Sequence, residues 1–156
     1  MTVSEIFTTA PTEGLTEEQQ EVFAVLERLQ IPYERVEHDW ANTMADCEAV
    51  SAALGVDVCK NLVLCNRQKT QYYLLSMPSD KPFRTKDLSH QLGCARLSFA
   101  EPEAMEALLH VHPGSASILS LLFDTAGKVQ LVMDRETKDC EYFSCHPCKS
   151  TGTLNL

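Results

Sequence analysis

The stretch Val58-Cys59-Lys60-Asn61-Leu62-Val63-Leu64-Cys65 decides the fold of this chain. It is a short apolar run with β-branched residues, and turn-forming residues follow it at positions 66–70, so it predicts a buried strand. Lys60 lies near the start of this strand, where its ammonium group must reach water, a carboxylate or a ligand. We interpret Lys60 as facing a ligand pocket that the rest of the chain holds in place. The alternative is an ordinary strand-end lysine whose stem is covered and whose charge reaches solvent.

Size and charge limit the classes of protein to which the chain can belong. Its 156 residues suffice for one domain with a sizeable core but not for two ordinary domains. The formal net charge is −9, from 13 basic and 22 acidic residues. Broad binding along a nucleic-acid backbone needs a basic surface, so this class is disfavoured. A small basic surface at the opening of a pocket, which contacts only the end of a nucleic acid, is compatible with this net charge.

The sequence shows no sign of export or membrane insertion. Its first residues lack the basic and apolar regions of a signal peptide. No apolar run approaches the roughly 18 residues that a membrane-spanning helix needs. The seven cysteines are an odd number, which is typical of reduced thiols in the cytoplasm. We therefore predict a cytoplasmic protein without membrane contact, and the sequence leaves its oligomeric state open.

Four amphipathic helices are expected, each with a recognisable start or stop. A capping box, formed by a threonine and a glutamine three residues later, opens the first helix. Glycine ends the second and third helices, and proline opens the fourth. These signals stand at Thr16 with Gln19, Thr43 with Gly55, Gly93, and Pro102.

About seven strands are expected around these helices, at 33–38, 60–65, 71–77, 96–99, 118–123, 129–133 and 140–144. Turn residues at 66–70 and 124–127 predict two hairpins with antiparallel strands. A purely parallel, doubly wound sheet is therefore not expected. We predict an α+β fold with a mixed, mainly antiparallel, barrel-like sheet and flanking helices. It would form a single domain over residues 16–156, preceded by an N-terminal arm over residues 1–15.

Cys145 and Cys148 form the most conspicuous motif, a pair of thiols separated by two residues. Structural zinc usually needs two such pairs, and only one is present, although Cys140 with His146 or His38 would add ligands. A thioredoxin-like pair belongs near the start of a fold, where a strand feeds a helix, whereas this pair lies near the C-terminus. We interpret both as unpaired thiols flanking a functional His-Pro turn, and we predict no metal site. A zinc or redox protein is the alternative.

The loop Gly114-Ser115-Ala116-Ser117 offers a different chemistry. The sequence contains no nucleophile elbow, P-loop or dinucleotide fingerprint. The loop is too short to cradle a phosphate, but its backbone N–H groups could face an oxyanion. An ordinary turn is the alternative reading of the same residues.

Three segments, in this order, resemble one family. Lys60-Asn61-Leu62-Val63-Leu64 resembles its lysine-bearing strand, and Pro113-Gly114-Ser115-Ala116-Ser117 resembles its Gly-Ser-x-Ser-Pro loop. His146-Pro147-x-x-Ser150-Thr151 resembles its closing His-Pro-x-x-Asn-Thr segment. The chain thus resembles the YbaK/ProX superfamily of aminoacyl-tRNA deacylases, above all the PrdX/ProXp branch associated with prolyl-tRNA synthetase, over about residues 17–156. It departs from the family pattern at Ile118, which replaces a proline, and at Ser150, which replaces the asparagine.

The resemblance implies trans-editing, the hydrolysis of a mischarged aminoacyl-tRNA ester, with alanine on a proline tRNA as the expected substrate. It implies no metal or organic cofactor. The expected partners are the tRNA acceptor end and, among proteins, prolyl-tRNA synthetase or an elongation factor. A non-catalytic module that binds an amino acid or the tRNA acceptor end on the same fold is the alternative.

The expected mechanism is electrostatic, because the sequence offers no convincing Ser-His-Asp or Cys-His set. Lys60 would bind the ester carbonyl, and backbone N–H groups of Gly114 and Ser115 would stabilise the oxyanion formed when water attacks. Selectivity would come from a pocket too small for the proline ring. The residues expected to bind substrate are Asn61, Leu64, Ser117, Ile118, His146 and Ser150, with Leu64 and Ile118 as pocket walls and Asn61 and His146 orienting the substrate. Positive charge at the mouth would come from Arg84, Lys86 and Lys149.

Overall fold

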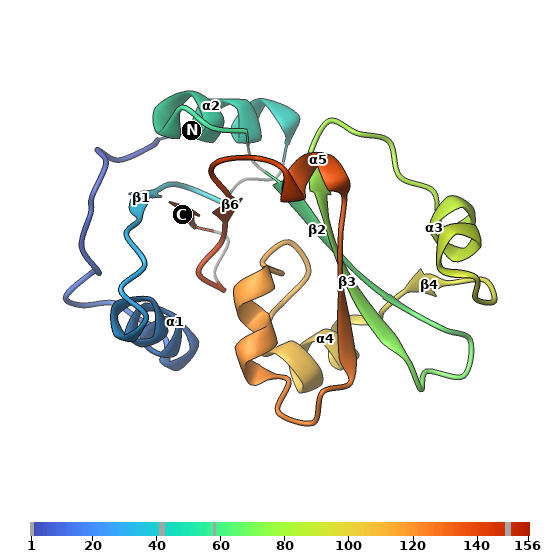
Figure 1. Cartoon of the computed structure of the whole chain (residues 1–156). Helices are drawn as coiled ribbons and strands as arrows, with labels where there is room; N and C mark the ends of the chain where they lie inside the picture. The colour runs from blue at the N-terminus through green and yellow to red at the C-terminus, as the bar shows by residue number, and fades with distance from the viewer. Residues whose placement is uncertain (1, 41–42, 58, 149–150) are drawn as a thin grey trace.

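The computed structural model of the chain describes residues 2–40, 43–57, 59–148 and 151–156. Its elements follow in the order α1 (Glu17–Arg28), β1 (Glu34–Glu37), α2 (Met44–Leu54), β2 (Cys59–Cys65), β3 (Tyr72–Pro78), α3 (Thr85–Leu92), β4 (Ser98–Phe99), α4 (Pro102–Leu109), the 3-10 helix η1 (Ile118–Phe123), β5 (Val129–Met133), α5 (Arg135–Lys138), β6 (Ser144–Cys145) and β7 (Gly152–Asn155). The strands form a four-stranded sheet and a three-stranded sheet (Figure 1). The α+β class is confirmed, but the prediction of a barrel-like sheet is wrong, because the two sheets stay separate and open.

The four-stranded sheet has the order β4-β2-β3-β5. β2 and β3 pair antiparallel from Cys59 opposite Pro78 to Cys65 opposite Tyr72, which confirms the predicted hairpin. Its turn is held by Asn66, whose side-chain Oδ1 accepts the backbone N–H groups of residues 70 and 71 at 2.9 and 3.1 Å. The sheet is mixed, as predicted, since β5 pairs with β3 in the parallel sense.

The segment expected as a strand at 118–123 is instead the 3-10 helix η1. Ser117 caps it, because its Oγ accepts the N–H of Leu119 at 3.1 Å. A continuous apolar run has no period that separates a strand from a helix, and the cap decides between them. The second predicted hairpin is therefore wrong. The turn at Asp124–Gly127 does form, through the Gly127 N–H and the Asp124 carbonyl, but it leads from η1 into β5.

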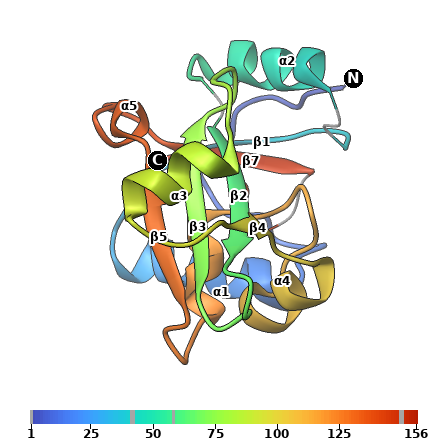
Figure 2. The same cartoon turned by 90° about the vertical axis from the view of Figure 1, so that its right-hand side faces the viewer.

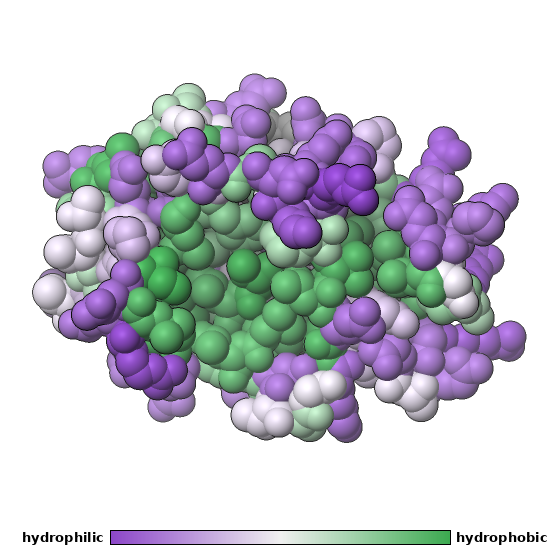
Figure 3. Space-filling model, viewed as in Figure 1, coloured by the Kyte–Doolittle hydropathy of each residue, from purple (hydrophilic) through white to green (hydrophobic). Residues whose placement is uncertain are grey.

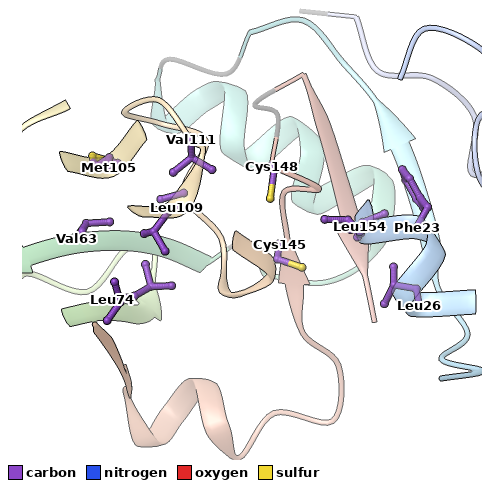
Figure 4. Packing of buried hydrophobic residues seen from close by; sticks show 13 residues of the cluster. Phe23, Leu26, Val63, Leu74, Met105, Leu109, Val111, Cys145, Cys148 and Leu154 are labelled. Carbon is purple, nitrogen blue, oxygen red and sulfur yellow. The ribbon is translucent and has the colours of Figure 1, made fainter. Parts of the chain in front are cut away.

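The β2–β3 pair separates two layers of core. Val63 and Leu74 face the main cluster, which they share with α1, α4 and β7 residues such as Leu109 and Leu154 (Figure 4). Leu64 and its neighbours on the opposite face pack in a second cluster beneath α3, the helix that crosses this face in Figure 2. The alternation along β2 thus buries both faces of the sheet.

The second sheet has the order β1-β7-β6, with antiparallel pairs throughout. The N-terminal arm lies along β1, where Val3 bridges to His38 and Phe7 bridges to Arg35. The Arg35 guanidinium lies over the Phe7 ring, 4.5 Å from its centroid, and donates from Nε to the Thr9 carbonyl at 2.6 Å. The arm is therefore fastened to β1 by backbone and side-chain contacts.

The predicted helix ends are confirmed. Thr16 with Gln19, and Thr43 with Asp46, form capping boxes at the starts of α1 and α2. α2 and α3 each end at a left-handed glycine, and Pro102 opens α4. In the described ranges, none of the helices is long and apolar enough to cross a membrane. Figure 3 shows apolar side chains over the face where η1 and β5 lie.

Candidate active site

A cleft of about 210 Å³ lies at the start of β2. Five parts of the chain converge on it: α2, β2, the turn after β3, the loop before η1, and the β6–β7 region. Its lining residues are Cys47, Val50, Cys59, Lys60, Asn61, Ser79, Gly114, Ala116, His146 and Thr153. The cleft brings together four of the predicted site residues, Lys60, Asn61, Gly114 and His146, which come from three separate segments.

Lys60 forms no ion pair with an acidic side chain among the described residues. Its Nζ donates to the backbone carbonyl of Lys81 at 2.5 Å. The side chain of Lys81 itself pairs with Asp134 at 2.8 Å. A lysine ammonium has three donors, so the Lys81 carbonyl fixes one and leaves two for a ligand.

His146 is held as a neutral ring with one free acceptor. Its Nδ1 lies 2.6 Å from the Gly152 carbonyl, which can only accept, so Nδ1 carries the proton. Burial lowers the pKa of His146 below its usual 6.5, and His38, whose ring centroid lies 6.2 Å away, lowers this pKa further. The hydrogen bond to Gly152 opposes these effects only in part. In the neutral ring Nε2 is therefore free to accept a hydrogen bond.

We expect protonation of His146 to destabilise the fold. Because its folded pKa is depressed, the unfolded chain binds this proton first, and stability falls as the pH drops below the unfolded value of about 6.5. The loss from one such group is at most about 1.4 kcal/mol per pH unit, and it levels off below the folded pKa. We expect the free energy of unfolding, measured with urea between about pH 8 and about pH 5, to fall less steeply with decreasing pH in His146→Gln than in the wild type. The exposed-site control His90→Gln should keep the wild-type slope. An unchanged slope in His146→Gln would contradict the assignment.

Asn61 has an unsatisfied acceptor at the cleft. Its side-chain Oδ1 is buried and has no hydrogen-bond partner within the described part of the chain. Leaving such an atom unpaired costs about 1–3 kcal/mol, and a ligand donor would remove that cost. The residues that line the cleft thus carry two hydrogen-bond acceptors, Oδ1 of Asn61 and Nε2 of His146, and one cationic donor, the ammonium group of Lys60.

The loop before η1 brings one of the two expected oxyanion donors, Gly114, to the cleft. Gly114 lines the cleft with φ of +90°, a left-handed conformation that favours glycine. The Ser115 N–H donates to the His112 carbonyl at 3.0 Å, and the Ser115 hydroxyl bonds to the same carbonyl at 2.8 Å. Ser115 is thus committed to closing the turn, so its expected role as an oxyanion donor does not fit this geometry. Gly114 remains the candidate donor.

The remaining expected site residues are placed elsewhere. Leu64 is fully buried in the cluster beneath α3, and Ile118 packs on the main core at the start of η1, so neither lines the cleft. Ser117 is also fully buried and caps η1. Ser150, with Lys149, lies outside the described residues. The apolar walls are Val50 and Ala116 instead.

The sequence did not identify Val50 as a cleft wall, because Cys47 and Val50 have the spacing of residues on the core-facing side of a helix. They do lie on one face of α2, and Val50 is 2% exposed. Thr153 was missed because its strand was not predicted. Its Oγ1 lies 2.8 Å from Nε2 of His38, while Nδ1 of His38 lies 2.7 Å from the Asp39 carbonyl. This contact orients His38 behind His146.

Cys145 and Cys148 are unpaired and buried, as predicted. Figure 4 shows them in the main cluster, near Leu109 and Leu154. Burial raises the pKa of each thiol to about 12, so both stay protonated and poorly reactive. Among the described residues, no group of three or more His, Cys, Asp or Glu is arranged to hold a metal ion.

Residues 38–156 match the family model of the aminoacyl-tRNA editing domain. The chain belongs to this family. It is 28% identical over 138 residues to the prolyl-tRNA editing protein ProX of Acetoanaerobium sticklandii, covering 88% of this chain and 84% of that one. It is 31% identical over 142 residues to the prolyl-tRNA synthetase associated domain-containing protein 1 of Xenopus laevis, with the same coverage.

A solved structure of a candidate trans-editing enzyme for prolyl-tRNA synthetase has the same fold, with a TM-score of 0.69 at 15% identity over 92% of this chain and 88% of that one. The resemblance to the YbaK/ProX superfamily is thereby confirmed. The protein is an aminoacyl-tRNA deacylase of the trans-editing class, and the cleft at Lys60 is its candidate active site.

Proposed function

We propose that the cleft hydrolyses the ester of alanyl-tRNA carrying the proline anticodon, with Lys60 as the main electrostatic catalyst. The observation that carries this proposal is the ammonium of Lys60, which has no ion pair among the described residues, beside two acceptors in a small cleft. The relatives named for prolyl-tRNA editing and for prolyl-tRNA synthetase support the choice of tRNA.

The polar groups of the cleft match those of an aminoacyl ester. The ester carbonyl needs a donor, and the two free N–H groups of Lys60 supply it. The α-amino group and the ribose hydroxyl need acceptors. Oδ1 of Asn61 has no hydrogen-bond partner among the described residues, and Nε2 of His146 is the acceptor nitrogen of the neutral ring. Binding in this orientation would satisfy the buried oxygen of Asn61 and would fix the carbonyl carbon for attack.

The chemistry requires no covalent intermediate with the protein. Water adds to the carbonyl carbon, and the C=O electron pair moves onto oxygen, where Lys60 and the N–H of Gly114 stabilise the negative charge. The tetrahedral intermediate then expels the ribose oxygen, and this oxygen takes up the proton that the attacking water released as the C–O bond breaks. The products are the free amino acid and the intact tRNA. Asn61 and His146 bind and orient the substrate in this scheme.

Cleft size would set the acyl preference. A volume of about 210 Å³ is small beside the ~300–1,000 Å³ of pockets that hold drug-sized ligands. The apolar side chains of Val50 and Ala116 narrow it further. One methylene is worth only about 1–3 kcal/mol to a synthetase, so a second, smaller site of this kind is needed to remove alanine that was attached in error.

A panel of tRNAs charged with alanine, serine and proline tests the proposal. We expect the alanyl ester to be cleaved at least about 10-fold faster than the prolyl ester, because roughly 1.4 kcal/mol of steric exclusion gives that ratio. Val50→Ala should widen the cleft and raise prolyl-ester cleavage relative to alanyl. Equal cleavage of the two esters by the wild type would contradict the size filter. Binding of charged tRNA without any cleavage would favour a non-catalytic module instead.

A further inference from the structure

The basic residues of this acidic chain are concentrated in one region. Residues 66–99 contain six lysines and arginines against two aspartates, a local charge of +4. The rest of the chain carries 7 basic and 20 acidic residues, a charge of −13. The region comprises the β2–β3 turn, α3 and β4, where hydrophilic side chains gather at the right of Figure 3. A charge separation of this size produces a local positive field on a protein that otherwise repels nucleic acid.

Three of these cations form a continuous basic track: Arg67, Lys86 and Arg96. One groove contains Arg67 and Arg96, a second contains Lys86 and Arg96, and Thr85 lines both. All three cations are exposed, and none takes part in a salt bridge with any residue that the structure describes. Free, exposed cations along a groove suit phosphate oxygens.

An aromatic ring lies in the same groove. Phe99 on β4 is 58% exposed and lines the groove with Arg67 and Arg96. Its ring packs against Phe83 in an edge-to-face contact, with centroids 6.0 Å apart. An exposed phenyl ring beside unpaired cations is the usual arrangement for stacking an unpaired base.

The basic track lies within reach of the cleft. β4 pairs directly with β2, with Phe99 opposite Leu64 and Ser98 opposite Cys65. Lys60 is four residues before Leu64 on β2, so roughly 13 Å separates Lys60 from the strand position opposite Phe99, at about 3.3 Å per residue. A stacked single strand advances about 3.4 Å per nucleotide, so about four nucleotides would span the gap. The turn after β3 also joins the two places, since Ser79 lines the cleft and Thr85 lines the track.

We propose that the basic track binds the acceptor arm of the tRNA whose ester enters the cleft. An unpaired base of the 3′ end stacks on Phe99. Phosphates of the neighbouring acceptor-arm nucleotides contact Arg67, Lys86 and Arg96. This assignment rests on the proposed function for the identity of the ligand. The track thus explains how a chain of net charge −9 holds tRNA, because it presents one local basic surface and needs no global one.

The test measures binding of uncharged tRNA across a range of salt concentrations. Arg67→Ala/Arg96→Ala should weaken binding at least about 10-fold and reduce the slope of log K against log salt by about 1–2. Phe99→Ala should weaken binding and leave that slope unchanged. The matched control Arg28→Ala/Lys128→Ala removes the same charge from exposed positions outside the track and should bind within about twofold of the wild type. Thermal melting of each variant verifies folding.

A second substrate separates this proposal from the proposed function. The alanyl ester of adenosine alone cannot reach the track, so Arg67→Ala/Arg96→Ala should cleave it at the wild-type rate while cleaving full-length alanyl-tRNA more slowly. A double variant that binds tRNA like the control, with the wild-type salt slope, would overturn the track assignment. If the wild type cleaved no ester, the proposed function would fail, while the binding comparison would still decide the track.

Discussion

Replacing Lys60 with alanine is expected to slow hydrolysis of alanyl-tRNA by about two orders of magnitude or more. Removing one donor to a developing oxyanion typically costs about 3 kcal/mol, which corresponds to that factor. In this cleft no other described cationic side chain lines the wall, so no neighbour replaces the lost charge. Single-turnover hydrolysis, measured with enzyme in excess, reports the chemical step directly.

A matched control separates loss of this cation from a general change in charge. Lys128→Ala removes an exposed lysine on the turn before β5, far along the chain from the cleft lining, and should leave the rate within about twofold of the wild type. Uncharged tRNA should bind Lys60→Ala nearly as well as the wild type, because the proposed contact of Lys60 is with the ester carbonyl. Near-normal hydrolysis by Lys60→Ala would show that the charge of this side chain does not drive the reaction.

The parts of the site that sequence identified are those with local chemical peculiarities. A lysine at the start of an apolar strand, a glycine in a loop and a histidine before a proline each stand out without knowledge of the fold. In the structure these three residues line one cleft. The walls were not identified in this way, because Val50 and Ala116 are ordinary apolar residues. They become part of a site only because α2 packs on β1 and the loop before η1 reaches the start of β2.

The fold was predicted where local sequence determines it and was not predicted where contacts between distant segments determine it. Helix ends were predicted well because caps depend on residues within one turn, as the boxes at Thr16 and Thr43 show. η1 was predicted as a strand because its apolar run has no distinguishing period. β7 was not predicted at all: Gly152–Asn155 contains glycine and asparagine, which are depleted in strands. It becomes a strand by pairing with β6 and with β1, and β1 is distant in the sequence.

This unpredicted strand joins the core to the candidate active site. The Gly152 carbonyl holds His146, and Thr153 holds His38 and lines the cleft. The next residue, Leu154, is fully buried in the main cluster with residues of α1 and α4. Side chains alternate along a strand, so Leu154 packs in the core on one face of β7, while Thr153 lies on the opposite face and lines the cleft. Packing at Leu154 therefore supports the geometry at Thr153.

Leu154→Ala is accordingly expected to lower the free energy of unfolding by about 2–5 kcal/mol, the range for leucine truncation in a rigid core. That is a large fraction of the roughly 5–15 kcal/mol that stabilises a typical domain. Urea unfolding followed by circular dichroism measures the change. Leu29→Ala removes the same atoms from a side chain that is 59% exposed at the end of α1, and it should cost less than about 0.5 kcal/mol. If the two variants lost equal stability, β7 would not be anchored in the core. If Leu154→Ala is destabilised as expected, the folded fraction should also turn over alanyl-tRNA more slowly, because the strand that holds His146 has lost its support.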